Sequence, residues 1–538
     1  MRAIYMLIFL ERKKNLKTWP VVNVGSRRSP TYLPAELCKV VAGQRTKAEV
    51  DTFQRDCMIK FALRNPLHDM KDIIPDGMKA VGLWRAENPM MDLYGLSVPD
   101  PKLVTVKSRV LPAPTIRYSQ GGTDHEIRWN LNSKRLSFDN VERNCSILYI
   151  NHIGKNSNDE CWEKLQSCYR NLKSHGVNIT GRQQSVITLT PNRDLERDLM
   201  QVFKENTEKI DCMIVVLPDQ SKTTYNCVKR LGDTKYGVAT VCIIASTLTK
   251  VNPRNLAGNL ALKFNLKFRN INQTVSAESL KDIVELRKTM VVGIDVTHSP
   301  DQGAPSIAGM VASVDEHLGQ WPATLEHQEK KGEEMVKHLS KMLKSRIEVW
   351  ASKNKNYPEN ILIYRDGVSE GQYDLVRKHE LPQLQETCKN MYQKGRMPKI
   401  TIIVVGKRHH TRFYDRDGEK YNPRPGTVVD RGVTEALNWD FFLVPHSPFK
   451  GTARPSHYFV VHDEIFRAKF KGEAANQLET FTHSLCFLFG RSTGAVSICT
   501  PAYYADIVCQ RARCYADDSP GMSDLQVHPR LRNTMFYI

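Results

Sequence analysis

The sequence predicts an α/β protein, with two successive α/β domains that follow a linker. Short apolar runs alternate along the chain with amphipathic stretches of helical period, the pattern expected when strands and helices alternate around a mainly parallel sheet. The length of 538 residues agrees with about three or four domains at roughly 100–200 residues per domain. Because 41% of the residues are hydrophobic and 25% are charged, the chain can bury ordinary cores, and wholesale disorder is excluded.

The part of the chain before about residue 139 has the least regular pattern. Residues 20–44 predict a short strand, a Gly-Ser turn and a loop. Residues 46–138 predict a helical stretch and then short extended segments around Pro99, Pro101, Pro112 and Pro114. This composition is typical of a linker with some structure of its own.

The middle and last parts carry the strand and helix signals. Within 139–275 we expect strands at 147–150, 213–217 and 239–245 and helices at 160–174, 223–231 and 253–268. Within 276–538 we expect a β-branched strand at 290–296 with a hairpin partner at 307–314, strands at 361–364 and 399–405, and helices at 333–352 and 373–389. Both parts therefore predict α/β domains.

The charge of the chain predicts an anionic partner. The 77 Lys and Arg against 58 Asp and Glu leave a formal charge of +19, which favours nucleic acid or a membrane surface as partner. No stretch approaches the roughly 20 apolar residues needed to span a bilayer. The thirteen cysteines are dispersed and have no C-x-x-C spacing, which is typical of buried free thiols in a reducing compartment. We therefore expect a cytoplasmic protein.

A basic segment in the middle domain predicts a phosphate pocket. Residues 221–270 hold nine Lys or Arg and a single acid. Tyr225 and Lys229 lie four residues apart on one expected helix, and Lys263 and Lys267 repeat that spacing on the next. Three ammonium groups and a phenol at one point suit a terminal phosphate with a stacked base. The alternative is a solvated basic face with a tyrosine packed at its rim.

A second set of residues predicts a carboxylate site in the last domain. Asp295 and Asp366 each follow a buried strand, and such strands end at the edge where α/β folds usually place chemistry. Cleavage of a phosphodiester by paired metal ions needs further oxygen ligands, for which Glu333 or Glu334 and Asp506 are candidates. The alternative for each aspartate alone is a helix cap or a turn residue.

Several segments resemble one known family in order along the chain. VVGIDVTHSP, YRDGVSEGQYD, GKRHHTR, GTARPSHY and PAYYADIVCQRAR resemble the PIWI domain of eukaryotic Argonaute proteins. YNCVKRLGDTKYGVAT and LALKFNLK resemble their MID domain, and TYLPAELCKVVAGQ resembles the end of their PAZ domain. The resemblance covers about residues 20–538.

This resemblance implies a domain organisation. It places a PAZ remnant at 1–45, the second linker at 46–138, a Rossmann-like MID domain at 139–275 and a ribonuclease H-like PIWI domain at 276–538. The family's N domain, first linker and most of PAZ have no counterpart here. We therefore expect an N-terminally truncated chain that keeps the anchoring of the guide 5′ end and loses the protection of its 3′ end.

The resemblance also implies a function. The family binds the 5′-phosphorylated end of a small guide RNA, pairs the guide with a target RNA and, in catalytic members, cuts the target with two Mg²⁺ ions, for which Mn²⁺ is a substitute. The expected partners are therefore guide RNA, complementary target RNA and silencing proteins. Two alternatives are a non-cleaving guide-RNA module that acts through recruited partners and a guide-independent nuclease of the ribonuclease H type.

The motifs of the family assign residues to these roles. Asp295 and Asp366 match the first and third members of the catalytic tetrad, and Asp506 stands where histidine is usual; these three are the expected metal ligands. Glu333 is the expected mobile glutamate, with Glu334 as the alternative. The expected contacts of the guide 5′ phosphate are Tyr225, Lys229, Lys263, Lys267 and Arg511, while Val241 replaces a glutamine of many relatives.

Overall fold

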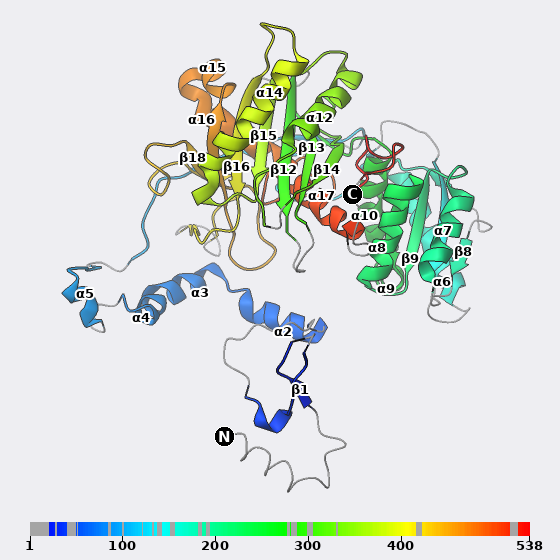
Figure 1. Ribbon diagram of the computed structural model, residues 1–538, viewed down its shortest axis with the longest axis horizontal. Helices are drawn as coiled ribbons and strands as arrows, with labels where there is room; N and C mark the ends of the chain where they lie inside the picture. Colours follow the sequence, from blue (N-terminus) through cyan, green and yellow to red (C-terminus); the bar gives the residue numbers. More distant parts are fainter. Residues whose placement is uncertain are drawn as a thin grey trace. The chain divides into compact units, whose positions relative to one another are not determined.

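The computed structural model of the chain divides into two compact units, Met1–Leu63 and Arg64–Ile538 (Figure 1). The structure describes residues 21–26, 29–39, 50, 52–83, 88–98, 102–120, 122–131, 134–136, 143–150, 157–180, 186–189, 194–276, 280, 288–298, 305–329, 332–415, 422–516 and 526–538. Residues 1–20 of the expected PAZ remnant lie outside these ranges. Across the described ranges, every helix is too short or too polar to cross a membrane.

The first unit is small. Its strands β1 (Val21–Asn23) and β2 (Tyr32–Pro34) form an antiparallel pair, and the short 3₁₀-helix η2 (Ala35–Leu37) follows. The expected helical stretch is α2 (Thr52–Ala62).

The second unit begins with helices α3 (Pro66–Lys71), α4 (Met78–Ala80) and α5 (Pro89–Leu93) and the short strands β3 (Arg109–Val110), β4 (Ile116–Arg117) and β5 (Thr123–Asp124). Strand β3 joins the edge of a nine-stranded sheet, and β4 pairs with both β5 and β11 (Thr274–Val275). The expected linker therefore pairs with the end of the middle domain through β11 and with the sheet of the last domain through β3.

The middle domain is built on a parallel sheet, as the sequence predicts. The strands β6 (Arg143–Ile150), β7 (Ile179–Thr180), β8 (Val186–Leu189), β9 (Cys212–Leu217) and β10 (Ala239–Ile244) all pair in parallel. The helices are α6 (Ser157–Ser174), α7 (Leu195–Asn206), α8 (Lys222–Arg230), α9 (Ala245–Lys250) and α10 (Pro253–Lys267).

Strand β9 shows how this sheet is covered on both faces. Val215 packs in a cluster with residues of α7 and α8, whereas Ile214 and Val216 pack in a cluster with residues of α6 and α10. Successive side chains of a strand point to opposite faces. An unbroken apolar strand is therefore what a sheet with helices on both faces requires.

The last domain is built on a mixed sheet of nine strands. Their order is β14-β13-β12-β15-β16-β19-β18-β17-β3. The bounds are β12 (Thr289–Thr297), β13 (Ile307–Ala312), β14 (Ala323–His327), β15 (Asn360–Asp366), β16 (Lys399–Gly406), β17 (Thr427–Val429), β18 (Asp440–Val444) and β19 (Ser456–Asp463). The central strands β12, β15 and β16 are parallel, and β13 is the antiparallel hairpin partner of β12.

Helices cover this mixed sheet on both faces. The helices α12 (Leu339–Asn354) and α14 (Leu381–Met391) share a core with Val292 and Ile294 of β12. The helices α16 (Ala474–Leu485) and α17 (Thr500–Ala516) share another core with Val291. Helix α12 begins at Leu339, six residues after the expected start at 333, because tertiary contacts described below hold the preceding residues in a loop.

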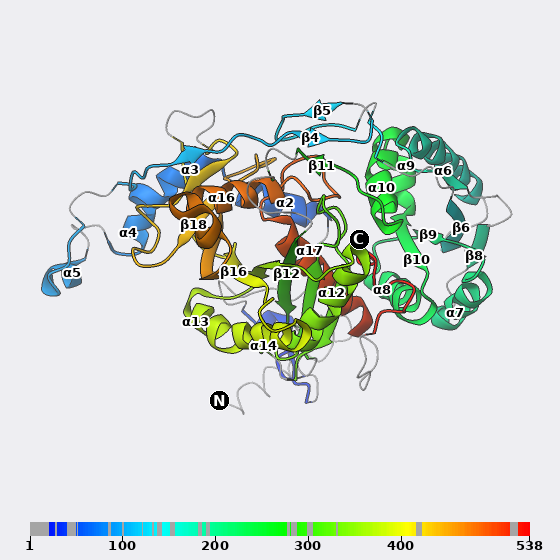
Figure 2. The same ribbon diagram turned by 90° about the horizontal axis from the view of Figure 1, so that it is seen from above.

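Helix α17 joins the two α/β domains. It packs against β12 and β13 on one side and against α8 on the other (Figure 2). A Cβ atom at Gly293 would lie 1.9 Å from the Pro501 carbonyl oxygen, so the helix and β12 meet backbone to backbone. The Cys509 thiol donates to the Asp295 carbonyl oxygen at 3.3 Å. The position of α17 is therefore closely fixed.

Candidate nucleic-acid site

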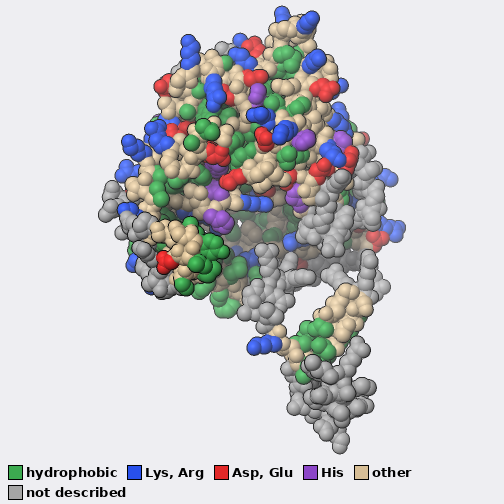
Figure 3. All heavy atoms as spheres, turned by 60° about the vertical axis from the view of Figure 1, so that its left-hand side comes forward, with side chains coloured by type: hydrophobic (Ala, Val, Ile, Leu, Met, Phe, Trp, Pro, Cys, Tyr) green, Lys and Arg blue, Asp and Glu red, His purple; other side chains and the backbone are tan. Residues whose placement is uncertain are grey.

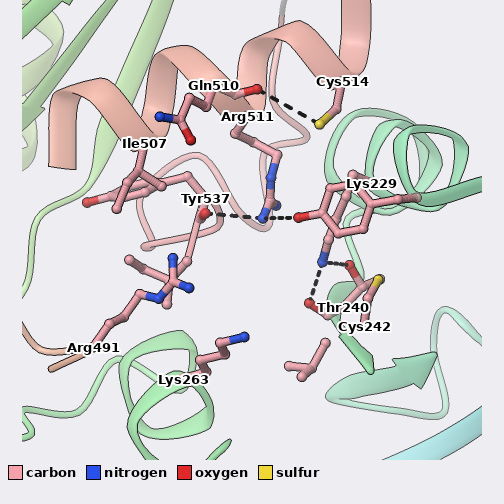
Figure 4. A pocket seen from close by; sticks show the side chains of 13 residues that line it. Lys229, Thr240, Cys242, Lys263, Arg491, Ile507, Gln510, Arg511, Cys514 and Tyr537 are labelled. Atoms are coloured by element: carbon pink, nitrogen blue, oxygen red, sulfur yellow. Dashed lines mark hydrogen bonds between the residues drawn. The ribbon is translucent and has the colours of Figure 1, made fainter. Parts of the chain in front are cut away.

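A cavity of about 280 Å³ opens where α17 meets the middle domain (Figure 4). Four of the five expected phosphate contacts lie on its wall: Tyr225, Lys229, Lys263 and Arg511. The remaining wall residues are Thr240, Val241, Cys242, Arg491, Ile507, Gln510, Cys514, Tyr537 and Ile538. We call this cavity the anion pocket.

Lysine and arginine side chains crowd the anion pocket. Figure 4 shows Lys263, Arg491 and Arg511 directed toward one space from three different segments. The pKa of Lys263 is lowered to about 8, first by burial and then by repulsion from Arg491 and Lys229. Lys229 is buried, and its ammonium donates to the Thr240 carbonyl and hydroxyl oxygens at 2.9 and 2.8 Å. An anion in this pocket would relieve the mutual repulsion of the cations.

Arg511 ties α17 to the middle domain and to the end of the chain. Its Nη1 donates to the Asp233 carboxylate at 2.8 Å and to the Phe536 carbonyl at 3.0 Å. Its Nη2 donates to the Tyr537 carbonyl at 3.1 Å and to the Tyr225 hydroxyl at 3.5 Å. Four of the five guanidinium N–H groups thus have protein partners. The bonds of Arg511 therefore fix one wall of the pocket.

The positions of Lys267 and Arg491 differ from those that the sequence predicts for the phosphate pocket. The side chain of Lys267 is buried, and its ammonium donates to the Phe536 carbonyl at 2.8 Å. Lys267 therefore supports the chain end, and the pocket wall does not include it. Arg491 lies on the wall, but it is far from the basic segment 221–270 in sequence. Local spacing gave no signal for it.

The three expected aspartates meet at one end of the nine-stranded sheet. Asp295 lies on β12 and Asp366 ends the neighbouring parallel strand β15. Asp506 lies on α17, which packs on β12. Burial raises the pKa of Asp295, and repulsion from Asp366 and Asp506 raises it further. Burial and repulsion from Asp506 also raise the pKa of Asp366, whereas the hydrogen bond that its carboxylate accepts from the Gly367 amide lowers it. The three carboxyl groups are thus close enough to repel one another.

Glu334 is the glutamate that lies beside these aspartates. A Cβ atom at Gly367 would lie 2.9 Å from Asp295 Oδ1 and 3.0 Å from Glu334 Oε1. The other oxygen, Glu334 Oε2, lies 2.8 Å from His298 Nε2. Glu334 Oε1 is buried and accepts no hydrogen bond, although Arg365 Nη1 lies 3.5 Å away.

Glu333 points elsewhere. Its Oε1 lies 3.4 Å from the Lys337 ammonium. Both glutamates belong to the loop before α12, because Val336 N–H donates to the Glu380 carboxylate at 3.0 Å and Arg365 donates to the Glu334 carbonyl oxygen. The structure therefore brings the alternative, Glu334, to the aspartates, whereas Glu333 pairs with a lysine.

The donor set of this carboxylate site suits a hard divalent cation. Its oxygen ligands would be Asp295, Glu334, Asp366 and Asp506, and carboxylate oxygens suit Mg²⁺ or Mn²⁺. A cation would also compensate the repulsion that raises the aspartate pKa values. In the described ranges, no three His, Cys, Asp or Glu side chains already stand at metal-binding distances. The carboxylates would therefore have to close around an ion.

Two basic side chains of the loop after β16, Lys407 and Arg408, lie near the carboxylate site. Burial raises the pKa of Asp506 and of Asp366, and the charge of Arg408 offsets part of this rise. Lys407 in the same loop donates to the Ser497 hydroxyl. On the face shown in Figure 3, Lys and Arg side chains are spread among Asp and Glu. A phosphodiester near the carboxylates would therefore meet nearby positive charge.

Comparisons with known proteins agree with this geometry. A family model described as "Piwi domain" matches residues 212–517. The chain is 31% identical to Protein argonaute 1A of Oryza sativa subsp. japonica over 552 residues, 94% of this chain and 49% of that protein. It is 30% identical to Protein argonaute 18 of the same organism, over 98% of this chain and 51% of that protein. The chain thus spans about half the length of the curated relatives it matches.

Two solved structures resemble this one. The crystal structure of Kluyveromyces polysporus Argonaute with a guide RNA aligns with a TM-score of 0.82 at 26% identity, covering 96% of this chain and 62% of that one. The structure of the N. crassa QDE-2 AGO MID-PIWI domains aligns with a TM-score of 0.55 at 31% identity, covering 74% and 98%. Both the parallel sheet and the mixed sheet therefore have counterparts in known structures.

Proposed function

Because this chain belongs to the Piwi-domain family of Argonaute proteins, we propose that it is a small-RNA-guided silencing protein. It would bind the 5′-phosphorylated end of a guide RNA and cleave complementary target RNA. One observation carries this proposal: helix α17 contributes Arg511 to the anion pocket and Asp506 to the carboxylate site. A single RNA path past this helix would connect a terminal phosphate to a scissile one.

The anion pocket supports binding of a 5′ phosphate. A terminal phosphate carries close to two negative charges at neutral pH. Lys229, Lys263, Arg491 and Arg511 offer the cations, and Tyr225 offers a ring on which the first base could stack. The relative from K. polysporus was solved with a guide RNA. In this chain, we assign the guide 5′ end to the anion pocket.

The carboxylate site supports hydrolysis of a phosphodiester. Asp295, Asp366, Asp506 and Glu334 would hold two Mg²⁺ ions, with Mn²⁺ as a substitute. When bound, such ions activate water and stabilise charge on the scissile phosphate. The chain's own part is to hold four oxygen ligands on β12, β15, α17 and the loop before α12, and Arg408 would orient the phosphate.

Cleavage of a labelled target tests this function. A 5′-phosphorylated guide, its complementary target and Mg²⁺ should give a single cut opposite guide positions ten and eleven. Asp295→Asn should abolish the cut and leave guide affinity intact. Tight guide binding without cleavage would instead support the non-cleaving module. Guide affinity that ignores removal of the 5′ phosphate would support the guide-independent nuclease.

We also propose that the protein acts in the cytoplasm with guide RNA, target RNA and silencing proteins as partners. The described cysteines are free thiols, which fits a reducing compartment. Imaging of a fluorescent fusion would test the location. An exclusively nuclear or secreted signal would contradict it.

A further inference from the structure

One side chain touches both sites. Gln510 lies on the wall of the anion pocket (Figure 4). Its Nε2 also donates to Asp506 Oδ2 at 2.8 Å. Asp506 and Gln510 are four residues apart on α17, so the helix places them one above the other. The two sites are therefore linked by one hydrogen bond within one helix.

The helix backbone between the sites is held in place. Gly293 and Pro501 meet at its start, and the Cys509 thiol bonds to the Asp295 carbonyl in its middle. Arg513 donates to the Pro305 carbonyl at 3.1 Å near its end. Because these contacts restrain the backbone, a change in the pocket would reach Asp506 through side chains.

A matched pair lies on another helix, and its residues are not on the wall of the anion pocket. On α7, Gln201 Nε2 donates to Glu205 Oε1 at 3.0 Å, again across four residues. Pairs of this kind stabilise a helix only weakly. What distinguishes Gln510 is therefore its place on the pocket wall, and Gln201 is the natural control.

We propose that Gln510 is a positioning residue that couples the two sites. An occupant of the anion pocket confines the exposed Gln510 side chain, and the confined amide then fixes the Asp506 carboxylate for metal binding. The amide engages Oδ2 and leaves Oδ1 for the ion, and it remains a neutral donor because amides do not titrate. This inference rests on the proposed function and deepens it: metal binding becomes tighter when a 5′-phosphorylated end is seated.

A measurement of Mn²⁺ affinity tests the coupling without any cleavage. Mn²⁺ binding to the full chain is followed by electron paramagnetic resonance, with and without saturating uridine 5′-monophosphate. The signal is corrected for Mn²⁺ bound to free nucleotide, and uridine serves as the probe without phosphate. We expect the nucleotide to tighten Mn²⁺ binding about fivefold, which is the lower end of the range of affinity changes typical of coupled binding sites. By reciprocity, Mn²⁺ should tighten nucleotide binding by the same factor.

Substitutions assign the effect to one side chain. Gln510→Met keeps the length of the side chain and removes the donor, so the fivefold difference should disappear. Gln510→Ala should behave alike, and thermal unfolding checks that both variants are folded. Gln201→Met should keep the full difference.

Each other outcome overturns the inference in a recognisable way. A fivefold effect that persists in both Gln510 variants means that the coupling does not use this residue. Nucleotide binding that leaves Mn²⁺ affinity unchanged in the unmodified protein refutes the coupling alone and leaves the proposed function standing. Failure of the nucleotide or of Mn²⁺ to bind refutes the anion pocket or the carboxylate site, and the inference falls with it.

Discussion

Binding of a phosphate to the anion pocket should be accompanied by uptake of a proton at alkaline pH. The pKa of Lys263 in the empty pocket is about 8, compared with an ordinary value of 10.5, because burial and neighbouring cations disfavour its charge. A bound phosphate dianion would favour that charge and raise the pKa again. The phosphate group itself does not titrate in this range, since its second pKa is about 6.

The size of the effect follows from these two pKa values. At pH 8.5 about a quarter of Lys263 is protonated in the empty pocket, so restoration of the ordinary pKa takes up about 0.75 proton. At pH 7 the uptake is about 0.1 proton. The affinity of the pocket for the phosphate is therefore fully present below the pKa that Lys263 has in the empty pocket. This affinity falls as the pH rises from about 8 toward 10.5. Between pH 7 and pH 9 it should weaken about tenfold.

Titration calorimetry measures this uptake directly. Binding of uridine 5′-monophosphate is measured in two buffers of different ionisation enthalpy, at pH 7 and at pH 8.5. Lys263→Met should remove the uptake at pH 8.5, whereas substitution of the exposed Lys250 by Met should leave it unchanged. Equal binding enthalpies in the two buffers at pH 8.5 would show that no proton is taken up and would refute the prediction.

Three further predictions concern the glutamates, the bonds of α17 and its packing. Glu334→Gln should slow target cleavage about a hundredfold or more, whereas Glu333→Gln should change the rate less than about threefold; the reverse order would show that the other glutamate acts. Asp233→Asn should weaken guide binding about tenfold or more, because it removes the charge that holds the α17 arginine; an unchanged filter-binding affinity would contradict this. Gly293→Ala should lower the free energy of unfolding by about 1–3 kcal/mol or more, whereas Gly406→Ala, with open space around its added methyl, should change it little. Equal urea midpoints for the two alanine variants would refute the close contact.

Most of the fold could be predicted from the sequence because the buried strands are short apolar runs that alternate with amphipathic stretches. The run 213–217 falls within β9, and 307–314 contains β13, the hairpin partner of β12. The pocket residues Tyr225 and Lys229 were also predictable, because a four-residue spacing on one helix places both side chains on one face.

The differences between the expected and the observed positions come from contacts that local spacing does not encode. Lys263 and Lys267 share the face of one helix, yet only Lys263 reaches the pocket, because residues at the end of the chain cover Lys267. The loop before α12 is held by Glu380 and Arg365, which are distant in sequence. No helical period could show which of two adjacent glutamates would turn toward the aspartates.

The two sites have opposite charge and lie on one helix, and this arrangement has a physical consequence. Arg511 and Asp506 are five residues apart, about 7.5 Å along the helix axis at 1.5 Å per residue. A free carboxylate at that distance would compete with a phosphate for the arginine. Asp233 holds the guanidinium group of Arg511 in place, because its carboxylate accepts hydrogen bonds from Arg511 and from the Tyr515 hydroxyl. With the arginine held on one side and Asp506 held by Gln510 on the other, the pocket stays cationic while the carboxylate site stays free for a metal ion.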